Sequence, residues 1–396
     1  MKVCVIGAGI SGLAVALALA VKGAEVTVLE QAEEIREVGA GLQISPNGVR
    51  VLEALGLRGA LEKNAVQGQA VSLRNYSDAR EVVRLDLEQS RHGKDYFFVH
   101  RADLIELLAN GAREAGVKIR LLQKVIEADC SKNPYVKTSC GNTIHADVVI
   151  GADGLHSVLR KTILGVTAPY FTHQTAWRAV VPNDLHLPPE ARVYMGPKRH
   201  LVCYPLRSGE LTNIVAVQER RDWVDEGWFH KDDPKNLIAA FADFGHEVHS
   251  LLERVTDVSY WGLFKHPVAS SWHKGHTALL GDAAHPTLPF MAQGAVMGLE
   301  DAWVLADELG SGKPIGTALQ DYQNRRKDRA TKVIDTASGN AWKYHLSFGP
   351  TRWAAHLGLG VLGAIAPRRL LNQFDWIYGY DVTKADQAAS STQTGT

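Results

Sequence analysis

Hydrophobic and polar positions alternate differently in successive parts of the chain. In residues 2–30, an apolar run (KVCVI) leads to a glycine turn, a largely apolar helical stretch (ISGLAVALALAVKG) and a second apolar run (AEVTVL). Short apolar runs next to glycine are typical of buried strands, and the longer run is typical of a buried helix. The pattern therefore predicts a β-turn-α-β unit, and the order strand, loop and helix returns after residue 276.

The central part, from about residue 170 to 265, alternates like half-buried strands and is richer in tryptophan and tyrosine. Its strand-like pieces are TAWRAVVP, RHLVCYPL and LTNIVAVQE, and one helix is predicted near 235–253. Three further strand-like pieces lie in 69–99, before an amphipathic helix over 100–116. The chain is thus predicted to be α/β, with one domain interrupted by a mostly β insertion and followed by a C-terminal helical segment.

The predicted organisation has four parts, whose ranges alternate along the chain. They are an α/β domain (1–70, 100–170 and 266–345), a β-sheet insertion (71–99 and 171–265), C-terminal helices (346–384) and a disordered tail (385–396). The tail, ADQAASSTQTGT, is small and polar, so it has little apolar surface to bury.

One apolar stretch, WAAHLGLGVLGAIA (353–366), needs separate interpretation. It is shorter than the roughly 20 residues that a membrane span requires, and it contains His356. We expect a packed C-terminal helix or a contact in a homodimer, and no integral membrane segment. Contact with a membrane interface remains the alternative.

Composition and charge argue against several classes of function. Lys+Arg and Asp+Glu both number 43, so a nucleic-acid binder that relies on a positive field is not expected. The four cysteines show no CxxC spacing, which predicts reduced thiols and no metal site. Met1 and Lys2 lead directly into a strand-like run without the features of a secretory signal, so we expect a cytoplasmic protein.

The first motif with chemical meaning is GAGISG, at residues 7–12. It follows a strand, opens a helix and is followed by Glu30 at the end of the next strand. Gly7 permits the tight turn, Gly9 lets the backbone approach a diphosphate, and Gly12 lets the helix pack on the strand. The free N–H groups at the helix start favour an anion, and Glu30 is suited to ribose hydroxyls. The motif predicts a dinucleotide site but does not choose between NAD and FAD.

Two later strings share one design. VVIGADGLHSVLR (148–160) and LLGDAAHP (279–286) each place an aspartate beside glycine at a strand end, and AQGA (292–295) begins a helix after the second. A short nicotinamide dehydrogenase does not need three such loops. A long cofactor does, because it has an adenosine, a diphosphate, a ribityl chain and a ring system to hold.

These three motifs together resemble those of the single-component FAD-dependent aromatic hydroxylases, the class A flavoprotein monooxygenases. The resemblance covers about residues 1–345. The forms GAGLQISPNGVRVLEALGL (39–57), WRAVVP (177–182) and AQGA look most like salicylate hydroxylase, 3-hydroxybenzoate 6-hydroxylase and 6-hydroxynicotinate 3-monooxygenase. The resemblance implies that the α/β domain is a Rossmann-like FAD-binding domain and that the insertion is a substrate-binding domain.

The resemblance also implies roles for individual residues. Those expected at FAD are Gly7, Gly9, Ile10, Ser11, Gly12, Glu30, Gly41, Arg101, Val125, Asp153, Gly154, Asp282 and Ala295. Among these, Asp282 matches the acid that binds the ribityl chain, and Asp153 belongs to a motif linked to both FAD and the nicotinamide nucleotide. Taken alone, Asp282 is equally explained by a helix cap or a turn.

By resemblance, NADH or NADPH reduces FAD, which reacts with O2, and a flavin hydroperoxide transfers oxygen to an electron-rich ring. No second GxGxxG follows a strand-like run and opens a helix, because GLGVLG (358–363) lies inside an apolar helical stretch; this is in keeping with a nicotinamide nucleotide that binds only transiently. The protein must exclude water, orient the substrate and help to deprotonate a phenol. The expected substrate is a hydroxybenzoate- or hydroxypyridine-carboxylate-like acid. Its carboxylate could be bound by Arg178, Arg192 or Arg199, and the alternative for each of them is a solvated surface position.

The candidate catalytic residues are His200, Tyr204, Pro286 and Gln293. His200 and Tyr204 are four positions apart on a strand-like run, so they share one face, while Cys203 lies on the other. The alternatives are a solvated His200 on the surface, and a Gln293 that only makes a hydrogen bond at a helix start. Pro286 matches a family proline near the flavin ring.

Other functions are compatible with parts of this pattern. Related FAD proteins epoxidise alkenes or hydroxylate quinone precursors, and a non-catalytic FAD-binding sensor would keep the same loops. A plain NAD dehydrogenase would not need Asp153-Gly154 or Gly281-Asp282.

Overall fold

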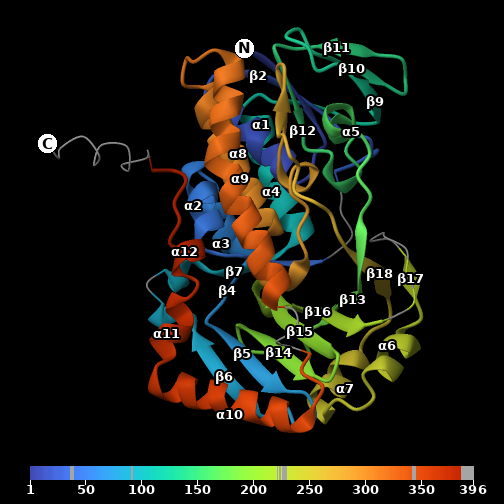
Figure 1. The fold of residues 1–396 in the computed structure, drawn as a ribbon, viewed down its shortest axis with the longest axis vertical. Coiled ribbons are helices and arrows are strands. Elements are labelled where there is room, and N and C mark those ends of the chain that lie inside the picture. The colour runs from blue at the N-terminus through green and yellow to red at the C-terminus, as the bar shows by residue number, and fades with distance from the viewer. Residues whose placement is uncertain are drawn as a thin grey trace, which may run out of the picture.

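The computed structural model describes residues 1–35, 40–90, 92–220, 222, 224, 230–340 and 345–384. A parallel sheet with its helices occupies one end of the elongated molecule, and a large, mostly antiparallel sheet occupies the other (Figure 1). This confirms the predicted α/β fold with a mostly β insertion. The predicted disordered tail, 385–396, lies outside the described residues.

The first sheet has six strands in the order β19-β20-β12-β1-β2-β8. Its strands are β1 (Lys2–Ile6), β2 (Glu25–Leu29), β8 (Lys118–Arg120), β12 (Val148–Gly151), β19 (His273–Lys274) and β20 (Thr277–Leu279). All of its pairings are parallel except that of β19 with β20. The carboxyl ends of β1, β12 and β20 therefore meet at one edge, and each is followed by one of the three motifs.

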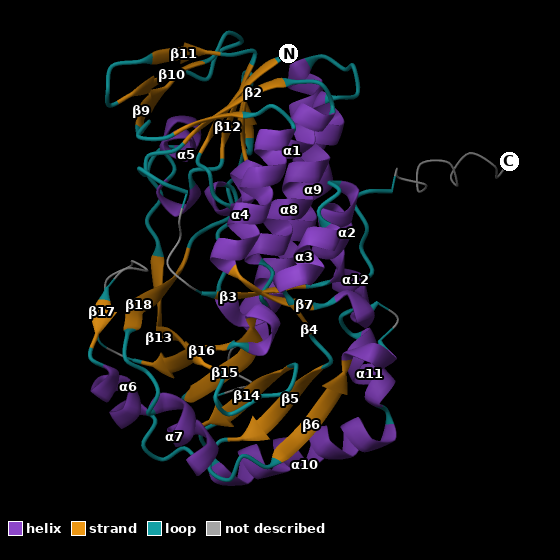
Figure 2. Cartoon of the chain, turned by 180° about the vertical axis from the view of Figure 1, so that it is seen from behind, coloured by secondary structure: helices purple, strands orange, loops and turns teal. Residues whose placement is uncertain are grey.

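Long helices cover this sheet: α1 (Ile10–Val21), α4 (Arg101–Glu114), α8 (Gly294–Leu309) and α9 (Ile315–Asn340). Helix α1 is apolar on nearly every face because it packs on both α4 and α8. The same domain also contains three shorter helices, α2 (Pro46–Ala54), α3 (Arg58–Asn64) and α5 (Val158–Leu164). Figure 2 shows α1, α4, α8 and α9 gathered on the same side of the sheet.

The large sheet has eight strands in the order β17-β18-β13-β16-β15-β14-β5-β6. They are β5 (Ala70–Asn75), β6 (Glu81–Asp86), β13 (Tyr170–Pro182), β14 (Glu190–Gly196), β15 (Arg199–Leu206), β16 (Leu211–Glu219), β17 (Lys231–Asp232) and β18 (Val258–Lys265). One face of this sheet packs on the short helices α6 (Pro234–Ala240) and α7 (His246–Leu252), and the other face is directed toward the parallel-sheet domain (Figure 1).

Two three-stranded sheets complete the strands. One has the order β3-β7-β4 and consists of β3 (Gly41–Ile44), β4 (Val66–Gln67) and β7 (Phe97–His100). The other has the order β11-β10-β9 and consists of β9 (Val125–Ala128), β10 (Tyr135–Thr138) and β11 (Thr143–His145). Strand β7 thus pairs outside the large sheet, although β5 and β6 lie in it. The short 3-10 turns are η1 (Leu87–Gln89), η2 (Gly93–Asp95), η3 (Gly154–His156), η4 (Arg207–Gly209), η5 (Gly281–Ala283) and η6 (Pro289–Met291).

The single helix predicted near 235–253 is wrong, because two short helices occupy this range. They are α6 (Pro234–Ala240) and α7 (His246–Leu252). The break comes at Gly245, whose N–H donates to the Tyr76 carbonyl at 2.8 Å instead of continuing a helix. A Cβ at Gly245 would also lie 2.6 Å from the Ser77 carbonyl oxygen, so close contact with this turn requires glycine.

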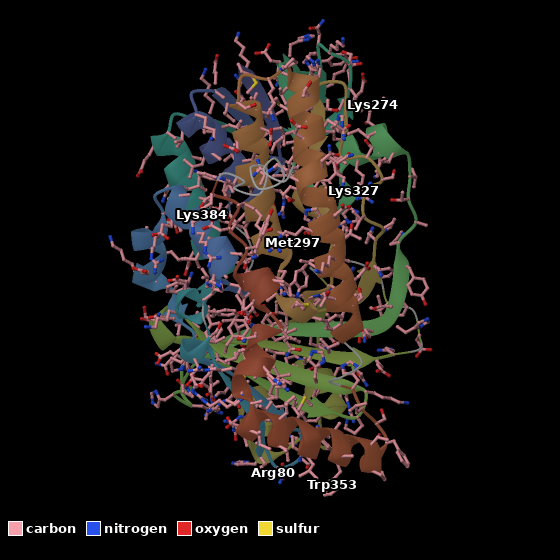
Figure 3. The ribbon with its side chains drawn as sticks, turned by 60° about the vertical axis from the view of Figure 1, so that its left-hand side comes forward. Arg80, Lys274, Met297, Lys327, Trp353 and Lys384 are labelled. Atoms are coloured by element: carbon pink, nitrogen blue, oxygen red, sulfur yellow. The ribbon has the colours of Figure 1, made fainter. Side chains whose placement is uncertain are left out.

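The C-terminal helices are α10 (Gly349–Ile365), α11 (Pro367–Asn372) and α12 (Asp375–Tyr378). Helix α10 packs on β6 along the outer side of the large sheet, as a packed helix was expected to do. Its opposite face carries exposed Trp353, Leu357, Val361 and Ile365, and Trp353 lies at the outer margin of the molecule (Figure 3). Among the described residues, no helix combines the length and apolarity that crossing a membrane requires.

Candidate active site

The GAGISG loop has the geometry that its three glycines predict. Gly7 has φ +98°, and a Cβ at Gly12 would lie 2.0 Å from the Gly7 carbonyl oxygen. Gly9 differs from both, because its φ is −76° and a Cβ there would meet nothing within 4 Å. Gly7 and Gly12 therefore serve the turn and the packing of α1, while Gly9 borders open space beside the start of α1. That space is where a diphosphate fits.

Glu30 closes the same corner of the sheet. Its two carboxylate oxygens accept hydrogen bonds from Ala8 N at 2.8 Å and Ala32 N at 2.9 Å. Glu30 therefore supports the glycine loop directly. Each carboxylate oxygen keeps a lone pair that can accept a hydrogen bond from a ribose hydroxyl. Ile10 is buried in the core, and Ser11 packs against the third motif: a Cβ at Gly298 would lie 2.1 Å from Ser11 Oγ.

The second motif forms a turn and a helix start. Asp153 Oδ2 accepts a hydrogen bond from Val158 N at 2.7 Å, and Ser157 Oγ accepts one from Arg160 N at 2.9 Å. Burial raises the pKa of Asp153. Gly154 has φ +69°, which favours glycine. Asp153 thus organises the start of α5, and whether it also contacts a nucleotide stays a prediction.

Arg160 connects the second motif to the third. Its buried guanidinium donates to the carbonyls of Ala283 at 2.9 Å, Ala284 at 3.2 Å and Pro267 at 2.6 Å. One guanidinium thus connects three backbone carbonyls, of which that of Ala284 also accepts a hydrogen bond from Ala269 N at 2.8 Å. The sequence placed Arg160 in a motif but gave it no role, and the structure shows that it holds the 281–286 loop in place.

Asp282 and Arg101 converge beside this loop. The Asp282 side chain has a large solvent-accessible surface, yet the surrounding protein raises the pKa of its carboxyl group. The nearby charges of His285 and Arg101 oppose this rise. The two facts agree if the carboxylate borders an opening inside the fold and not the outer surface. An acid inside such an opening suits the hydroxyls of a ribityl chain, so Asp282 and Gly9 both fit FAD.

Behind the loop lies an ionic cluster, which we call the α8–α9 cluster: His285, Glu300, Asp301 and Arg326, which are buried, and Arg329, which is partly buried. Asp301 accepts hydrogen bonds from Gly281 N at 3.0 Å and Arg326 Nε at 2.8 Å, and it pairs with His285 Nε2. Burial raises the pKa of Asp301, but His285 and Arg326 outweigh it, and the pKa is about 2. His285 is therefore directed into the protein, where it orients the loop.

The same cluster reaches the start of α8. Glu300 pairs with Arg326 Nη1 at 2.7 Å and accepts a hydrogen bond from Asn47 at 2.7 Å. The side-chain amide of Gln293 donates to Ser45 Oγ at 3.0 Å and accepts from Asn47 at 3.3 Å. The Gln293 side chain thus connects the start of α8 to the start of α2. These contacts match the alternative given in the sequence analysis, in which Gln293 only makes a hydrogen bond at a helix start.

The side of the large sheet that faces the FAD loops we call the inner face, made of Ala176, Arg178, Val215, Val217, Trp261, His200 and Tyr204. Leu288 and Phe290, from the loop before α8, pack on its apolar members. Arg178 lies over the Trp261 ring, with its guanidinium carbon 5.3 Å from the ring centroid. The inner face and this loop enclose aromatic and apolar side chains around one guanidinium.

His200 and Tyr204 both lie on the inner face, and Cys203 packs on the opposite one. The alternative of a solvated His200 is wrong, because its side chain is buried and its ring lies 6.0 Å from that of Phe290. Burial raises the pKa of Tyr204, opposed by Arg178, so the phenol stays protonated. Tyr204 stacks on Phe98, with 5.0 Å between ring centroids.

The remaining predicted residues lie in three places. Gly41 donates to Asn213 Oδ1 at 2.7 Å and leaves no room for a side chain against Tyr204. Pro286 is buried in the loop, and Ala295 lies in the first turn of α8. Val125 is buried on β9, beside α5. The structure thus brings the three motifs to one edge of the parallel sheet, with Val125 set apart from them on its own small sheet.

Several residues of the site have no role in the sequence analysis. Glu300 and Asp301 are adjacent acids in the middle of the largely apolar helix α8, and buried acids need partners, so a signal was present. The partners Arg326 and Arg329 gave none, because α9 is rich in charged residues throughout.

Comparison with known proteins identifies the family. A profile of the FAD binding domain family matches residues 1–337. The chain is 34% identical to 3-amino-4-hydroxybenzoate 2-monooxygenase PtmB3 of Streptomyces platensis, over 96% of both chains. It is 33% identical to 3-hydroxybenzoate 6-hydroxylase of Polaromonas naphthalenivorans, also over 96% of both. A solved salicylate hydroxylase substrate complex superposes with a TM-score of 0.80 at 26% identity, covering 96% of each chain. The chain therefore belongs to the FAD binding domain family, as one of the FAD-dependent aromatic-ring monooxygenases that its three motifs predicted.

Proposed function

We propose that the protein hydroxylates a small aromatic acid, of the hydroxybenzoate or hydroxypyridine-carboxylate type, with NAD(P)H and O2. The observation that carries this substrate class is Arg178, a cation on the apolar inner face beside Trp261. The relatives are named for acting on aminohydroxybenzoate and hydroxybenzoate, which are rings with a carboxylate and a phenol. A guanidinium beside aromatic surface suits both parts of such a molecule.

Each protein group has a distinct task in this reaction. When bound, FAD takes a hydride from NAD(P)H and activates O2. Arg178 holds the substrate carboxylate by charge-assisted hydrogen bonds, and Leu288 and Phe290 cover the ring and exclude water. His200 accepts the phenolic proton, because its pKa is lowered by burial and by His345 and it is therefore a neutral base.

The other arginines considered for the carboxylate are engaged elsewhere. Arg192 is bonded to Glu190 at 2.6 Å and pairs with Glu247. Arg199 lies on the far side of the sheet, with its guanidinium carbon 6.0 Å from the ring centroids of Phe241 and Phe244, and it pairs with Asp243 at 3.0 Å. Arg178, by contrast, lies on the inner face beside Trp261, where Leu288 and Phe290 pack, and this position is why we assign it to the substrate.

The first experiment measures NADH and NADPH oxidation by the FAD-loaded protein with a panel of aromatic compounds, together with product and hydrogen peroxide. We expect one acid that carries both groups to stimulate oxidation and to be hydroxylated. Benzoate, which lacks the phenol, and phenol, which lacks the carboxylate, are the matched controls. If an alkene or a quinone precursor is oxygenated and no acid of the panel is, the proposed substrate class is wrong. If no compound stimulates the oxidation of NADH or NADPH, the result would favour the alternative of a non-catalytic FAD-binding sensor.

Replacing Arg178 by methionine is expected to raise KM for the aromatic acid by roughly 10- to 100-fold, because one or two charge-assisted hydrogen bonds are lost. The affinity for a substrate analogue without the carboxylate should stay the same. Steady-state kinetics and binding titrations measure both values. Arg199→Met is the control, since it removes a guanidinium from the opposite face and should leave KM unchanged. An equal loss of affinity for acid and analogue would contradict this role.

Three further proposals concern the setting of the reaction. The nicotinamide nucleotide binds transiently, a proposal supported by the presence of only one GxGxxG between a strand and a helix start among the described residues, since GLGVLG (358–363) lies within α10. The protein acts in the cytoplasm, supported by cysteines without CxxC spacing. It forms a homodimer, for which the exposed apolar row on α10 is the supporting surface. The measured mass in solution tests the last of these.

A further inference from the structure

Three titratable side chains form a hydrogen-bonded chain from the inner face to the outside of the protein. His200 Nδ1 lies 2.7 Å from His345 Nε2, and His345 Nδ1 lies 3.0 Å from Glu219 Oε1. His200 is 4% exposed, the His345 side chain 1% and the Glu219 side chain 40%. The chain of contacts therefore begins at a buried imidazole and ends at a carboxylate that water reaches.

The structure holds His345 in this position by its backbone. His345 precedes α10, and its carbonyl accepts hydrogen bonds from Lys198 N at 3.2 Å and Ser347 Oγ at 3.1 Å. Glu219 ends β16, and its N–H donates to the Lys198 carbonyl at 2.9 Å. The turn at Lys198 thus connects both partners to β15, which carries His200.

We propose that His345 and Glu219 are a proton relay between His200 and solvent. This inference rests on the proposed function, in which His200 is the base for the substrate phenol. In the starting state, His200 and His345 each carry their proton on Nδ1. The phenolic proton moves to His200 Nε2, the Nδ1 proton of His200 to His345 Nε2, and the Nδ1 proton of His345 to Glu219, which releases it to water.

The return of a proton resets the relay. Once the product phenolate has formed, a proton from water enters at Glu219 and moves to His345 Nδ1. The Nε2 proton of His345 then passes to His200 Nδ1, and the Nε2 proton of His200 passes to the product oxygen. One proton leaves and one enters in each turnover, so both rings regain their first tautomer and no charge remains in the protein.

Burial explains why His200 needs such a partner. It lowers the pKa of His200 and of His345, so neither ring holds a second proton for long. Phe290 covers His200 on the loop side and offers no acceptor. A buried His200 needs a path for its proton, and the hydrogen bond to His345 provides one.

The two arginines next in sequence to His200 and Glu219 are directed elsewhere. Arg199, next to His200, pairs with Asp243 on the opposite face. Arg220 follows Glu219, and its guanidinium donates to the Tyr260 hydroxyl at 3.0 Å. Glu219 therefore remains the acceptor for His345.

The test follows protons directly, with a pH-indicator dye in rapid mixing of the FAD-loaded protein and its aromatic acid. His345→Gln keeps an amide against His200 but cannot relay a proton, and Glu219→Gln removes the terminal acceptor. In both variants we expect proton release to slow by roughly 10- to 100-fold with unchanged final amplitude, and to depend more steeply on buffer concentration. Glu210→Gln, at the other end of β16, is the control and should release protons at the wild-type rate.

The two Gln variants separate a relay from a structural role. Glu219 is at the exposed end of the strand, so its variant decides the question if His345→Gln does not fold. Wild-type rates of proton release in Glu219→Gln, with normal hydroxylation, would overturn the relay and leave the proposed function standing. If the wild-type protein hydroxylates no aromatic acid at all, it is the proposed function that fails, and the relay fails with it.

Discussion

Gly9→Val is expected to abolish FAD retention while leaving the apoprotein folded. The backbone at Gly9 has a φ of −76°, which a β-branched residue adopts, and a Cβ there meets no atom within 4 Å. The isopropyl group would therefore occupy the space beside the start of α1 without disturbing the core. Excluding the diphosphate removes at least two charge-assisted hydrogen bonds, so we expect the affinity for FAD to fall by roughly 100-fold or more.

Flavin content of the purified protein and titration of the apoprotein with FAD measure this loss, and circular dichroism reports the fold. Two other glycines serve as comparisons. Gly12→Val should unfold the protein, because its Cβ would lie 2.0 Å from the Gly7 carbonyl oxygen. Gly59→Ala, on exposed α3 with open space around it, should bind FAD normally. Normal FAD binding by Gly9→Val would mean that the cofactor does not use this loop.

Arg326→Met is expected to destabilise the protein by about 3–5 kcal/mol, because it leaves two buried carboxylates with an unbalanced charge. Arg326, Glu300 and Asp301 are all fully buried, and Arg326 pairs with both acids. Asp301 in turn holds Gly281 N and His285, so the loss extends to the loop that carries Asp282. We therefore expect lower FAD affinity in addition to lower stability.

Urea denaturation of the apoprotein measures the stability, and the shift caused by FAD measures the coupling to the cofactor. Lys118→Met is the control: it removes a cation paired with Glu25 at 2.8 Å on the exposed edge of the same sheet. Exposed pairs of this kind contribute little, so its midpoint should change only slightly. Equal midpoints for Arg326→Met and Lys118→Met would show that the α8–α9 cluster does not stabilise the fold.

The parts of the fold that local pattern determines could be predicted from the sequence. Glycine spacing, apolar runs and aspartates at strand ends are short-range signals, and they located three loops that the parallel sheet brings together. The helix expected near 235–253 was wrong because its break depends on Tyr76 and Ser77, which are distant in sequence.

Side-chain pairing in the site could not be predicted in the same way. His200 had charged neighbours in sequence, which favoured a surface position, yet it is buried against His345, 145 residues away. Gln293 looked suited to a substrate, but its amide is engaged by Ser45 and Asn47. A hydrogen bond between distant segments depends on where the backbone places them, and periodicity carries no information on that.

The burial of α1 between α4 and α8 has a consequence for biosynthesis. Nine residues of α1, from Ile10 to Leu19, are buried, but α8 begins only at Gly294. At roughly 5–20 residues per second, the ribosome needs on the order of 15–60 s to reach that point. During this time α4 is already available to α1, but the face of α1 that α8 later covers stays exposed on the nascent chain. The first segment made is thus among the last to be covered, and it is where we expect a chaperone to be needed during translation.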